Sequence, residues 1–324
     1  MGSTPSFPRV SIPKDNISVV TGGNTGVGYH TAKWLAMMGG TVIIACRSEE
    51  RAKQAIEQMN KEFEEEKEKK TTGIVDYDQL NVEFMSLDCN SLKSVISFVE
   101  AYKSSGRKLH KLFCNAGIGQ QDKLSYTEDG HEQIFQVNYL SQFLLVSHLL
   151  PLMKASGPDC RIILVSSIGH LFAHFDPVDV ELKKYSEPEC KSDKLYQNSK
   201  LCQIMQMYRL NEVLKDTNVT VFSLHPGTVR TELLTTFKRG MMKYVISMLE
   251  TVGASKSPFE GAWTSLNAGI NPELAGVRDV YFSDSKPTTP ASAARNKSYQ
   301  AALWDYSIEC LKGYLPDDIL SGLQ

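Results

Sequence analysis

The sequence predicts a single doubly wound α/β domain, built on a mostly seven-stranded parallel sheet with helices on both faces. Short apolar runs that suit buried strands alternate with helical stretches along the whole chain, which is typical of a parallel sheet covered on two sides. No internal repeat and no linker divides the 324 residues. With 42% hydrophobic and 22% charged residues, the chain has the balance of a globular protein with one large core.

Seven apolar runs account for the expected strands. The first run, NISVVTGG, is closed by glycines, and the helical stretch YHTAKWLAMMGG and the run TVIIACR complete a strand-helix-strand unit. The other five runs are VEFMSLD, KLFCNAG, RIILVSS, VTVFSLHPG and DVYFS. The helices expected between them include residues 91–104, 131–150 and 194–215.

The turn after the first strand suits a phosphate-binding site. It reads TGGNTGVG at residues 21–28, and a helix is expected to follow. Glycine permits positive φ and close approach of the backbone to a ligand, while the helix directs N–H groups and its positive dipole end at the loop. We therefore assign dinucleotide binding to Thr21, Gly22, Asn24, Thr25, Gly26, Val27 and Gly28. A plain tight turn is the alternative, whereas the Gly-Lys-Ser/Thr of a P-loop is absent from this segment.

The end of the second strand favours NADP(H) over NAD(H). A carboxylate at this point accepts the ribose 2′-hydroxyl of NAD and repels the 2′-phosphate of NADP. Here the chain has Cys46 and Arg47 instead. The Arg47 guanidinium can bind a phosphate, and Ser48 adds a hydroxyl donor. Glu49 and Glu50 follow in the first turn of the next helix, where they complement the helix dipole.

Four segments fall outside the regular pattern. They are an N-terminal extension (1–14), a charged insertion (61–80), a substrate lid after the sixth strand (228–256) and a helical C-terminal tail (286–324). The charged run KEFEEEKEKK continues a helix whose apolar face is formed by Ala52, Ile56, Met59 and Phe63. Its charges are therefore expected on a solvated side, with an interaction tail as the alternative.

Composition and charge exclude several classes of protein. The net charge of −2 indicates no nucleic-acid surface, and seven dispersed cysteines suit a reducing compartment better than a disulfide framework. The N-terminus has no apolar core, so no signal peptide or anchor is expected, and segment 134–153 contains too many polar residues for a membrane span. We therefore expect a soluble cytoplasmic protein. The start MGSTPS fits the permissive myristoylation pattern at Gly2, and this point stays open.

Two Tyr-x-x-x-Lys pairs occur, and either could place a phenol beside an ammonium on one helix face. Tyr29 and Lys33 lie in the first helix, beyond the glycine turn, and are expected to be packing and surface residues. Tyr196 and Lys200 follow the strand that ends in VSS, so they can approach the carboxyl edge of the sheet, where ligands bind in open α/β folds. This context favours Tyr196 as a proton donor.

Several motifs in the same order resemble those of the short-chain dehydrogenase/reductase family. They are TGGNTGVG, CNAG at 114–117, Asn138 in VNYLSQF, VSS at 165–167, YQNSK and HPGTVRTE. The stretch ACRSEERAK, the insertion before Tyr196 and the tail SYQAALWDYSIECL look more like its retinol dehydrogenase-like and WW-domain oxidoreductase-like branch. Many members of that branch carry an N-terminal membrane anchor, and no such segment is visible here.

The resemblance implies a Rossmann-type fold and a role for each matching position. Asp88 and Cys89 would contact the adenine, and Asn115, Ala116 and Gly117 would close the central cofactor cleft. Pro226, Gly227 and Thr228 would cradle the nicotinamide. Asn138 would hold a water in a proton relay behind Lys200, and Ser167, rather than its neighbour Ser166, would be the catalytic serine. The helices at 131–150 and 194–215 are the usual dimer surfaces of this family, although this branch also contains monomers and membrane-bound members, so a homodimer and a monomer both stay open.

The expected chemistry explains why these side chains are needed. Hydride transfer to a carbonyl leaves an alkoxide that must be protonated, and an ordinary tyrosine, with a pKa near 10, exchanges protons poorly at neutral pH. The Lys200 ammonium would lower the pKa of Tyr196 and would bind the nicotinamide ribose. Ser167 would hydrogen-bond to the substrate oxygen.

The segment after HPG indicates the kind of substrate. TVRTELLTTFKRGMMKYVISMLE is rich in Leu, Met, Phe and Tyr, which suits a lid over a steroid, retinoid, terpenoid or lipid carbonyl, although it also suits a core-packing helix. Lys238, Arg239 and Lys243 could touch a membrane surface. His170 and His174 have helical spacing near Asp176, but no third ligand is defined, so no metal site is assigned. A non-catalytic NADP(H)-binding sensor or scaffold on the same fold is the alternative function.

Overall fold

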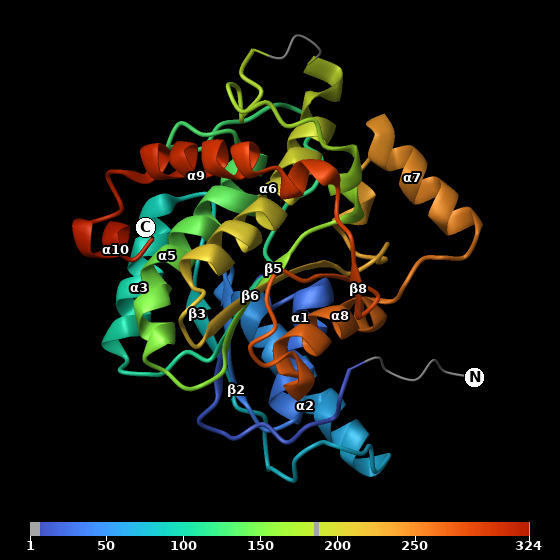
Figure 1. The fold of residues 1–324 in the computed structure, drawn as a ribbon. Helices are drawn as coiled ribbons and strands as arrows, with labels where there is room; N and C mark the ends of the chain where they lie inside the picture. Colours follow the sequence, from blue (N-terminus) through green and yellow to red (C-terminus); the bar gives the residue numbers. More distant parts are fainter. Residues whose placement is uncertain (1–6, 185–187, 324) are drawn as a thin grey trace.

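An eight-stranded sheet runs through the middle of the protein, with helices on both faces (Figure 1). The structure, a computed structural model, describes residues 7–184 and 188–323. The strand order is β3-β2-β1-β4-β5-β6-β7-β8, and every pairing is parallel except that of β7 with β8. The strands are β1 (Ile17–Thr21), β2 (Thr41–Cys46), β3 (Val82–Ser86), β4 (Lys111–Cys114), β5 (Cys160–Val165), β6 (Val219–His225), β7 (Tyr281–Ser283) and β8 (Lys286–Thr288).

The predicted doubly wound fold is confirmed, with one added strand. The seven parallel strands fall within the seven apolar runs, whereas β8 is a short antiparallel edge strand at the start of the segment expected to be a helical tail. The helices are α1 (Gly26–Met37), α2 (Glu49–Glu68), α3 (Leu92–Ser104), α4 (Gln133–Phe135), α5 (Ser141–Lys154), α6 (Pro188–Val213), α7 (Gly240–Thr251), α8 (Pro258–Ile270), α9 (Lys297–Leu311) and α10 (Asp317–Ser321). Shorter helical turns are the π-helix η1 (Gln136–Leu140) and the 3₁₀ turns η2 (Ile168–Phe172), η3 (Leu234–Thr236), η4 (Pro272–Leu274) and η5 (Ser292–Arg295).

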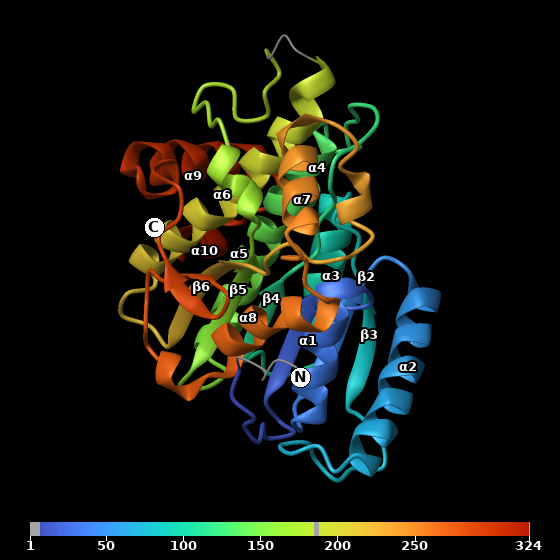
Figure 2. The ribbon, with the colours of Figure 1, turned by 90° about the vertical axis from the view of Figure 1, so that its right-hand side faces the viewer.

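The sheet has a separate apolar core on each face, because neighbouring residues of a strand point to opposite sides. Val20, for example, packs with α1, α2 and α8, whereas Val19 packs with α3, α5 and α6. Figure 2 shows α1, α2 and α8 grouped on one side of the sheet. Burial on both faces is why these strands are continuous apolar runs in the sequence.

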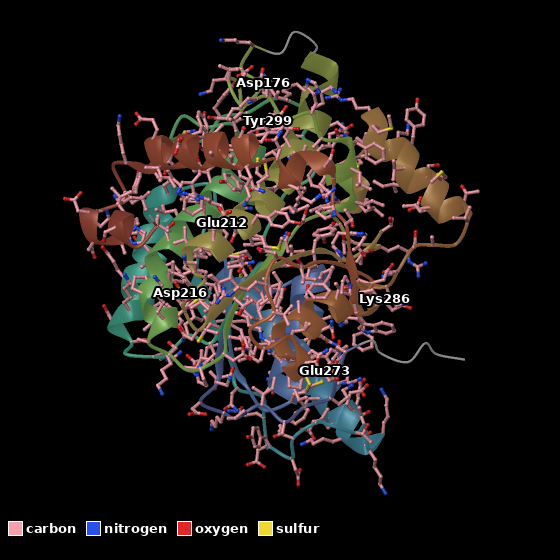
Figure 3. The ribbon with its side chains drawn as sticks, in the orientation of Figure 1. Asp176, Glu212, Asp216, Glu273, Lys286 and Tyr299 are labelled. Atoms are coloured by element: carbon pink, nitrogen blue, oxygen red, sulfur yellow. The ribbon has the colours of Figure 1, made fainter. Side chains whose placement is uncertain are left out.

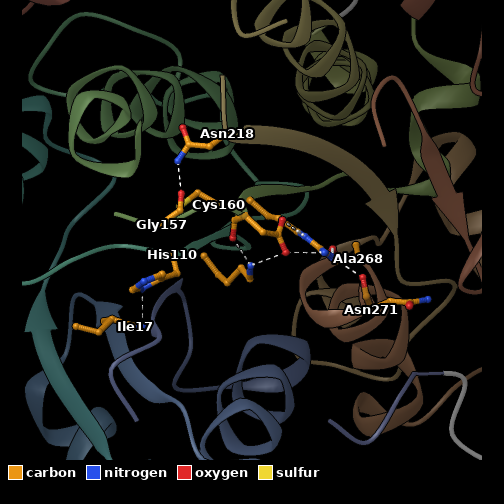
Figure 4. Close-up of polar contacts among 10 residues, drawn as sticks. Ile17, His110, Gly157, Cys160, Asn218, Ala268 and Asn271 are labelled. Atoms are coloured by element: carbon orange, nitrogen blue, oxygen red, sulfur yellow. Dashed lines mark hydrogen bonds and ion pairs between the residues drawn. The ribbon is translucent and has the colours of Figure 1, made fainter. Parts of the chain in front are cut away.

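The amino-terminal edge of the sheet is held by buried polar contacts (Figure 4). Arg161 on β5 is 1% exposed and donates to the carbonyl oxygens of Ala268 (3.1 Å) and Asn271 (2.9 Å), which ties α8 to the sheet. His110 Nδ1 accepts from the Ile17 N–H at 3.0 Å. These contacts hold the amino-terminal ends of the strands together, whereas the carboxyl-terminal ends border the cavity described below.

The helix α9 in the C-terminal tail packs on α6 and reaches η1 and α5 through single side chains (Figure 1). The Tyr139 and Ser307 hydroxyls are 2.8 Å apart, and the Phe143 and Trp304 rings meet edge to face with centroids 5.0 Å apart. Part of the surface of the two helices that the resemblance assigned to a homodimer is thus covered by the chain's own tail.

The charged run at residues 61–70 faces solvent, because all its positions except Phe63 are exposed or half-buried. Ala52, Met59 and Phe63 of α2 are buried and Ile56 is half-buried, while Glu212, Asp216, Glu273 and Lys286 project from the surface (Figure 3). Free thiols are found at Cys46, Cys89, Cys114, Cys160, Cys202 and Cys310. Among the described helices, none combines the length and apolar character needed to traverse a bilayer. The myristoylation pattern at residues 1–6 lies outside the described residues.

Candidate active site

A cavity of about 700 Å³ opens at the carboxyl ends of the strands. It extends from the turn after β1, past the loops after β2, β3 and β4, to the segments that follow β5 and β6. The strand order reverses between β1 and β4, and open α/β sheets bind their ligands at such a switch point. Sequence-predicted residues in its lining are Gly22, Asn24, Thr25, Gly26, Val27, Arg47, Ser48, Asp88, Cys89, Asn115, Ala116, Gly117, Ser167, Tyr196, Lys200, Pro226, Gly227 and Thr228.

The glycine turn has the shape that a phosphate needs. Gly22 and Gly26 have φ values of +64° and +54°, a backbone region that disfavours side chains. A Cβ on Gly28 would lie 2.3 Å from the Gly22 carbonyl oxygen, so only glycine fits there. Thr25 precedes α1 without a side-chain cap on the helix N-terminus, which leaves the positive end of α1 directed at the cavity.

Two of the predicted residues of this turn support the cavity without lining it. Gly28 is one, and Thr21 is the other. Thr21 is fully buried, and its hydroxyl oxygen accepts from the N–H groups of Asn115 (3.0 Å) and Ala116 (2.9 Å). This clamp joins the turn after β1 to the loop after β4 and sets the width of the cleft between them.

The adenosine end of the cavity has two arginines. Arg47 is exposed at the end of β2, as the sequence predicted, and Arg51 lines the same region one turn into α2. The Ser48 hydroxyl accepts from the Arg51 N–H at 3.3 Å and so caps α2. Sequence reasoning missed Arg51, although its spacing of four from Arg47 could have indicated it.

Tyr196, Ser167 and Lys200 converge in the cavity wall. The Ser167 side chain lies beside the Tyr196 ring, since a Cβ on Gly169 would be 3.3 Å from Tyr196 Cε1 and 3.5 Å from Ser167 Oγ. Lys200 Nζ lies 5.9 Å from the centre of the Tyr196 ring and donates to the Val165 carbonyl oxygen at 3.0 Å. The competing Ser166 hydroxyl donates to the Lys200 carbonyl oxygen instead, so Ser167 is the serine beside the phenol. Tyr29 and Lys33 are absent from the lining, and Lys33 pairs with Glu62 at 2.5 Å.

Burial disfavours the charged form of both Tyr196 and Lys200. It raises the pKa of Tyr196 to about 12, although the hydrogen bond from Ser167 acts in the opposite direction. It lowers the pKa of Lys200 to about 7. The expected lowering of the tyrosine pKa by the ammonium is therefore not a property of the protein alone, because the buried lysine is itself close to neutral.

Asn138 is fully buried on the π-helix η1 and does not line the cavity. Its side-chain oxygen accepts from the Ile118 N–H (2.7 Å), and its amide donates to the Ile118 carbonyl (3.0 Å). Behind it, Gln203 donates to the Asn138 carbonyl at 2.9 Å and accepts from Lys200 Nζ at 3.3 Å. Gln203 thus joins Lys200 to Asn138, a link that sequence reasoning missed although Gln203 lies one helical turn beyond Lys200.

The lid segment after β6 folds back onto Tyr196. The Phe237 ring meets the Tyr196 ring edge to face with centroids 4.8 Å apart, and Met242 and Ile246 of α7 line the cavity. Asp193, three residues before Tyr196, accepts from the Met241 N–H at 2.9 Å. A Cβ on Gly240, whose φ is +79°, would lie 2.6 Å from the same carboxylate, so this contact requires glycine.

The two histidines considered as metal ligands differ in their contacts. His170 Nδ1 donates to the Ser167 carbonyl at 2.7 Å, whereas His174 donates only its backbone N–H, to the Asn198 side chain at 2.9 Å. A different group, His131, Glu181 and Cys310, brings its ligand atoms within 4.8 Å of one another. The Glu181 carboxylate in that group already accepts from His131 and Tyr306.

The fold and the cavity define a dinucleotide-binding α/β protein with a tyrosine, a serine and a lysine at its site. Residues 16–175 match the short chain dehydrogenase family. The WW domain-containing oxidoreductase of Gallus gallus is 34% identical over 92% of this chain and 69% of that protein. Human polyprenol dehydrogenase is 33% identical over 91% of this chain and 84% of that protein. Human retinol dehydrogenase 14 is 36% identical over 92% of this chain and 86% of that protein.

Solved structures share the fold at lower identity. An uncharacterized protein from Mycobacterium paratuberculosis superposes with a TM-score of 0.69 at 23% identity, over 94% of this chain and 97% of that one. Actinorhodin polyketide ketoreductase, solved with NADPH, gives a TM-score of 0.60 at 17% identity, over 84% of this chain and 97% of that one. The protein belongs to the short-chain dehydrogenase/reductase family, in its retinol dehydrogenase-like and WW-domain oxidoreductase-like branch. Members of this family are oxidoreductases that bind a nicotinamide cofactor.

Proposed function

We propose that the protein is an NADP(H)-dependent oxidoreductase that interconverts a hydrophobic ketone or aldehyde with its alcohol. The observation that carries this proposal is the juxtaposition of the Ser167 and Tyr196 side chains, which lie in one cavity with the glycine turn after β1. When bound, the nicotinamide cofactor supplies or accepts the hydride. The two hydroxyls then contact the substrate oxygen, where Tyr196 donates or accepts the proton and Ser167 stabilises the developing charge.

Lys200 and Asn138 are proposed to position and tune this pair. The Lys200 ammonium would bind the ribose hydroxyls of the cofactor, whose negative phosphates favour the protonated lysine. A Cβ on Gly117 would lie 3.4 Å from Lys200 Nζ, so glycine at that position leaves room between the lysine and the cleft. Asn138 would act from behind by fixing Ile118, which lies in the cavity wall.

The choice of NADP(H) rests on the two arginines at the adenosine end. No acidic side chain stands at the end of β2, and Arg47 and Arg51 both face the cavity. Arg47→Asp should lower the ratio of kcat/KM for NADPH to that for NADH by about 10- to 100-fold, since a hydrogen bond to a charged group contributes about 1.5–3 kcal/mol. Arg295→Asp, at an exposed position on η5, is the matched control. An unchanged ratio in the Arg47 variant would remove this residue from cofactor selection.

The substrate class is inferred from the walls of the cavity and from relatives. Leu233, Leu234, Phe237, Met242 and Ile246 give the lid an apolar inner surface. Two relatives are named as dehydrogenases of retinol and polyprenol, both hydrophobic alcohols. The test is turnover of a panel of hydrophobic and small polar carbonyls with NADPH. Activity confined to hydrophobic compounds supports the proposal, whereas NADPH binding without turnover of any compound would favour a sensor or scaffold.

A further inference from the structure

The outer face of the lid helix α7 exposes a stripe of apolar side chains. Met241, Tyr244, Met248 and Val252 are 50%, 73%, 60% and 69% exposed, which is unusual for residues of this size. Their spacing of three, four and four residues places them within an arc of about 80° on the helix and its first following residue. We call these four residues the outer stripe.

The outer stripe is distinct from the face that packs on the protein. Met242 and Ile246 are 3% and 8% exposed and line the cavity, so they form the inner face of α7. The apolar surface of this helix extends well beyond that inner face. Lys243, Ser247 and Glu250 occupy the remaining polar side. Figures 1 and 2 show α7 at the periphery of the molecule, so the outer stripe faces outward.

Basic residues accompany the outer stripe. Segment 238–252 contains Lys238, Arg239 and Lys243 against Glu250, a difference of three minus one, or +2. Lys238 forms an exposed ion pair with Asp122 at 3.1 Å, which offsets its charge. Arg239 donates to the Asp122 backbone carbonyl at 3.0 Å and Lys243 is exposed, so these two residues supply the local positive charge. An apolar face flanked by lysine and arginine is typical of helices that lie in the interface of a membrane containing anionic lipids.

We propose that the outer stripe of α7 docks the protein on an anionic lipid surface. The same helix would then separate the bilayer from the cavity, with Tyr244 and Met248 on the lipid side and Met242 and Ile246 on the cavity side. Entry of a lipid-soluble substrate from the bilayer past α7 would rest on the proposed function, whereas docking itself does not. A second copy of the chain is a weaker candidate, because a stable dimer buries about 20–30 residues a side.

The test is co-sedimentation of the full chain with vesicles of phosphatidylcholine, with and without phosphatidylserine, in the absence of substrate. Wild type should bind the vesicles that contain phosphatidylserine and should bind less as salt is raised. Tyr244→Glu and Ser247→Glu each add one carboxylate to α7, but on the outer stripe and on the polar side respectively. The expected result is that Tyr244→Glu lowers the partition coefficient about tenfold more than Ser247→Glu.

Two results would overturn the proposal. One is that wild type does not bind either kind of vesicle, and the other is that the two variants lose binding equally. Sedimentation equilibrium of the same proteins tests for self-association. A wild-type dimer that Tyr244→Glu dissociates would make the outer stripe a self-association surface instead. Because no step of this assay needs turnover, failure of the proposed reaction would leave its result unchanged.

Discussion

At the scale of single residues, the site is built from groups that burial keeps close to neutral. Tyr196 and Lys200 are 3% and 4% exposed, and burial raises the pKa of the tyrosine while it lowers that of the lysine. A neutral phenol is the form that can donate a proton to an alkoxide. Burial thus keeps the proton on Tyr196 until a ligand changes the charges around the pair.

The depressed pKa of Lys200 predicts a pH dependence of stability. Between pH 7 and about 10.5 the unfolded chain holds a proton on this lysine and the folded protein does not, so the free energy of unfolding should rise with pH in that window. The slope from this group is at most about 1.4 kcal/mol per pH unit. Urea unfolding of the cofactor-free protein from pH 7 to 9 should show this rise in the free energy of unfolding in wild type but not in Lys200→Met. Parallel curves for the two proteins would contradict the neutral lysine.

Sequence reasoning predicted the three side chains that meet in the cavity wall, but not the partners that hold them. Tyr196, Ser167 and Lys200 could be predicted because their order and spacing are visible in the chain. The roles of Gln203 and Asp193 could not be predicted, because the contacts of a polar residue on a helix depend on which other elements pack against it. Asn138 lies behind the cavity rather than in it, since its amide is occupied by the Ile118 backbone.

At the scale of elements, the catalytic helix α6 holds the lid helix α7 at its N-terminus. Arg239, the residue before α7, makes no side-chain cap, and Asp193 accepts from the first N–H groups of that helix instead. Gln120 fixes the preceding turn, because its side-chain oxygen accepts from the Lys238 N–H at 2.9 Å. The closed position of α7 therefore depends on the carboxylate one turn before Tyr196.

Removing that carboxylate should loosen the lid. A lost helix cap costs about 1–2 kcal/mol, so Asp193→Ala should increase the open population of α7 about 5- to 30-fold. Limited proteolysis within residues 238–252 should quicken, and KM for the carbonyl should rise while the NADPH dissociation constant stays near that of wild type. Asp193→Asn keeps an acceptor oxygen, so its proteolysis rate and its KM should lie between those of wild type and Asp193→Ala. Equal proteolysis of all three proteins would show that Asp193 does not hold the lid.

The elements themselves were predictable to different degrees. Strands buried on both faces leave continuous apolar runs, so β1 to β7 could be located. Strand β8 is an exposed three-residue edge with Pro287, which leaves no such signal. The π-helix η1 was also missed, because its sequence QVNYL lies in the middle of an apolar helical stretch.

At the scale of the whole molecule, α9 decides which surfaces are available. It packs on α6 and reaches α5 through contacts such as that of Phe143 with Trp304, and Trp304 is only 5% exposed. Part of the surface that the resemblance assigned to a homodimer is thus covered within one chain. Sequence patterns showed that a helix was present in the tail but not where it would pack.

This arrangement predicts a protein that sediments as one chain at micromolar concentration, with a mass near 36.1 kDa. Trp304→Ala should lower the free energy of unfolding by about 3–5 kcal/mol, since a large buried aromatic is lost. Sedimentation equilibrium and urea unfolding check the two expectations. A stable dimer whose interface includes α5 and α6, with Trp304→Ala unfolding like wild type, would mean that α9 does not cover these helices in solution.

The central claim is that the Tyr196 hydroxyl delivers the proton in a hydride-transfer reaction. The direct measurement is NADPH oxidation, followed by absorbance, with a hydrophobic aldehyde and the wild-type, Tyr196→Phe and Tyr29→Phe proteins. Tyr196→Phe should lose about 10²- to 10⁴-fold in kcat while binding NADPH normally, because only the proton donor is removed. Tyr29→Phe should have the same kcat and the same NADPH binding as wild type. A Tyr196→Phe protein that reduces the aldehyde at the wild-type rate would contradict the account.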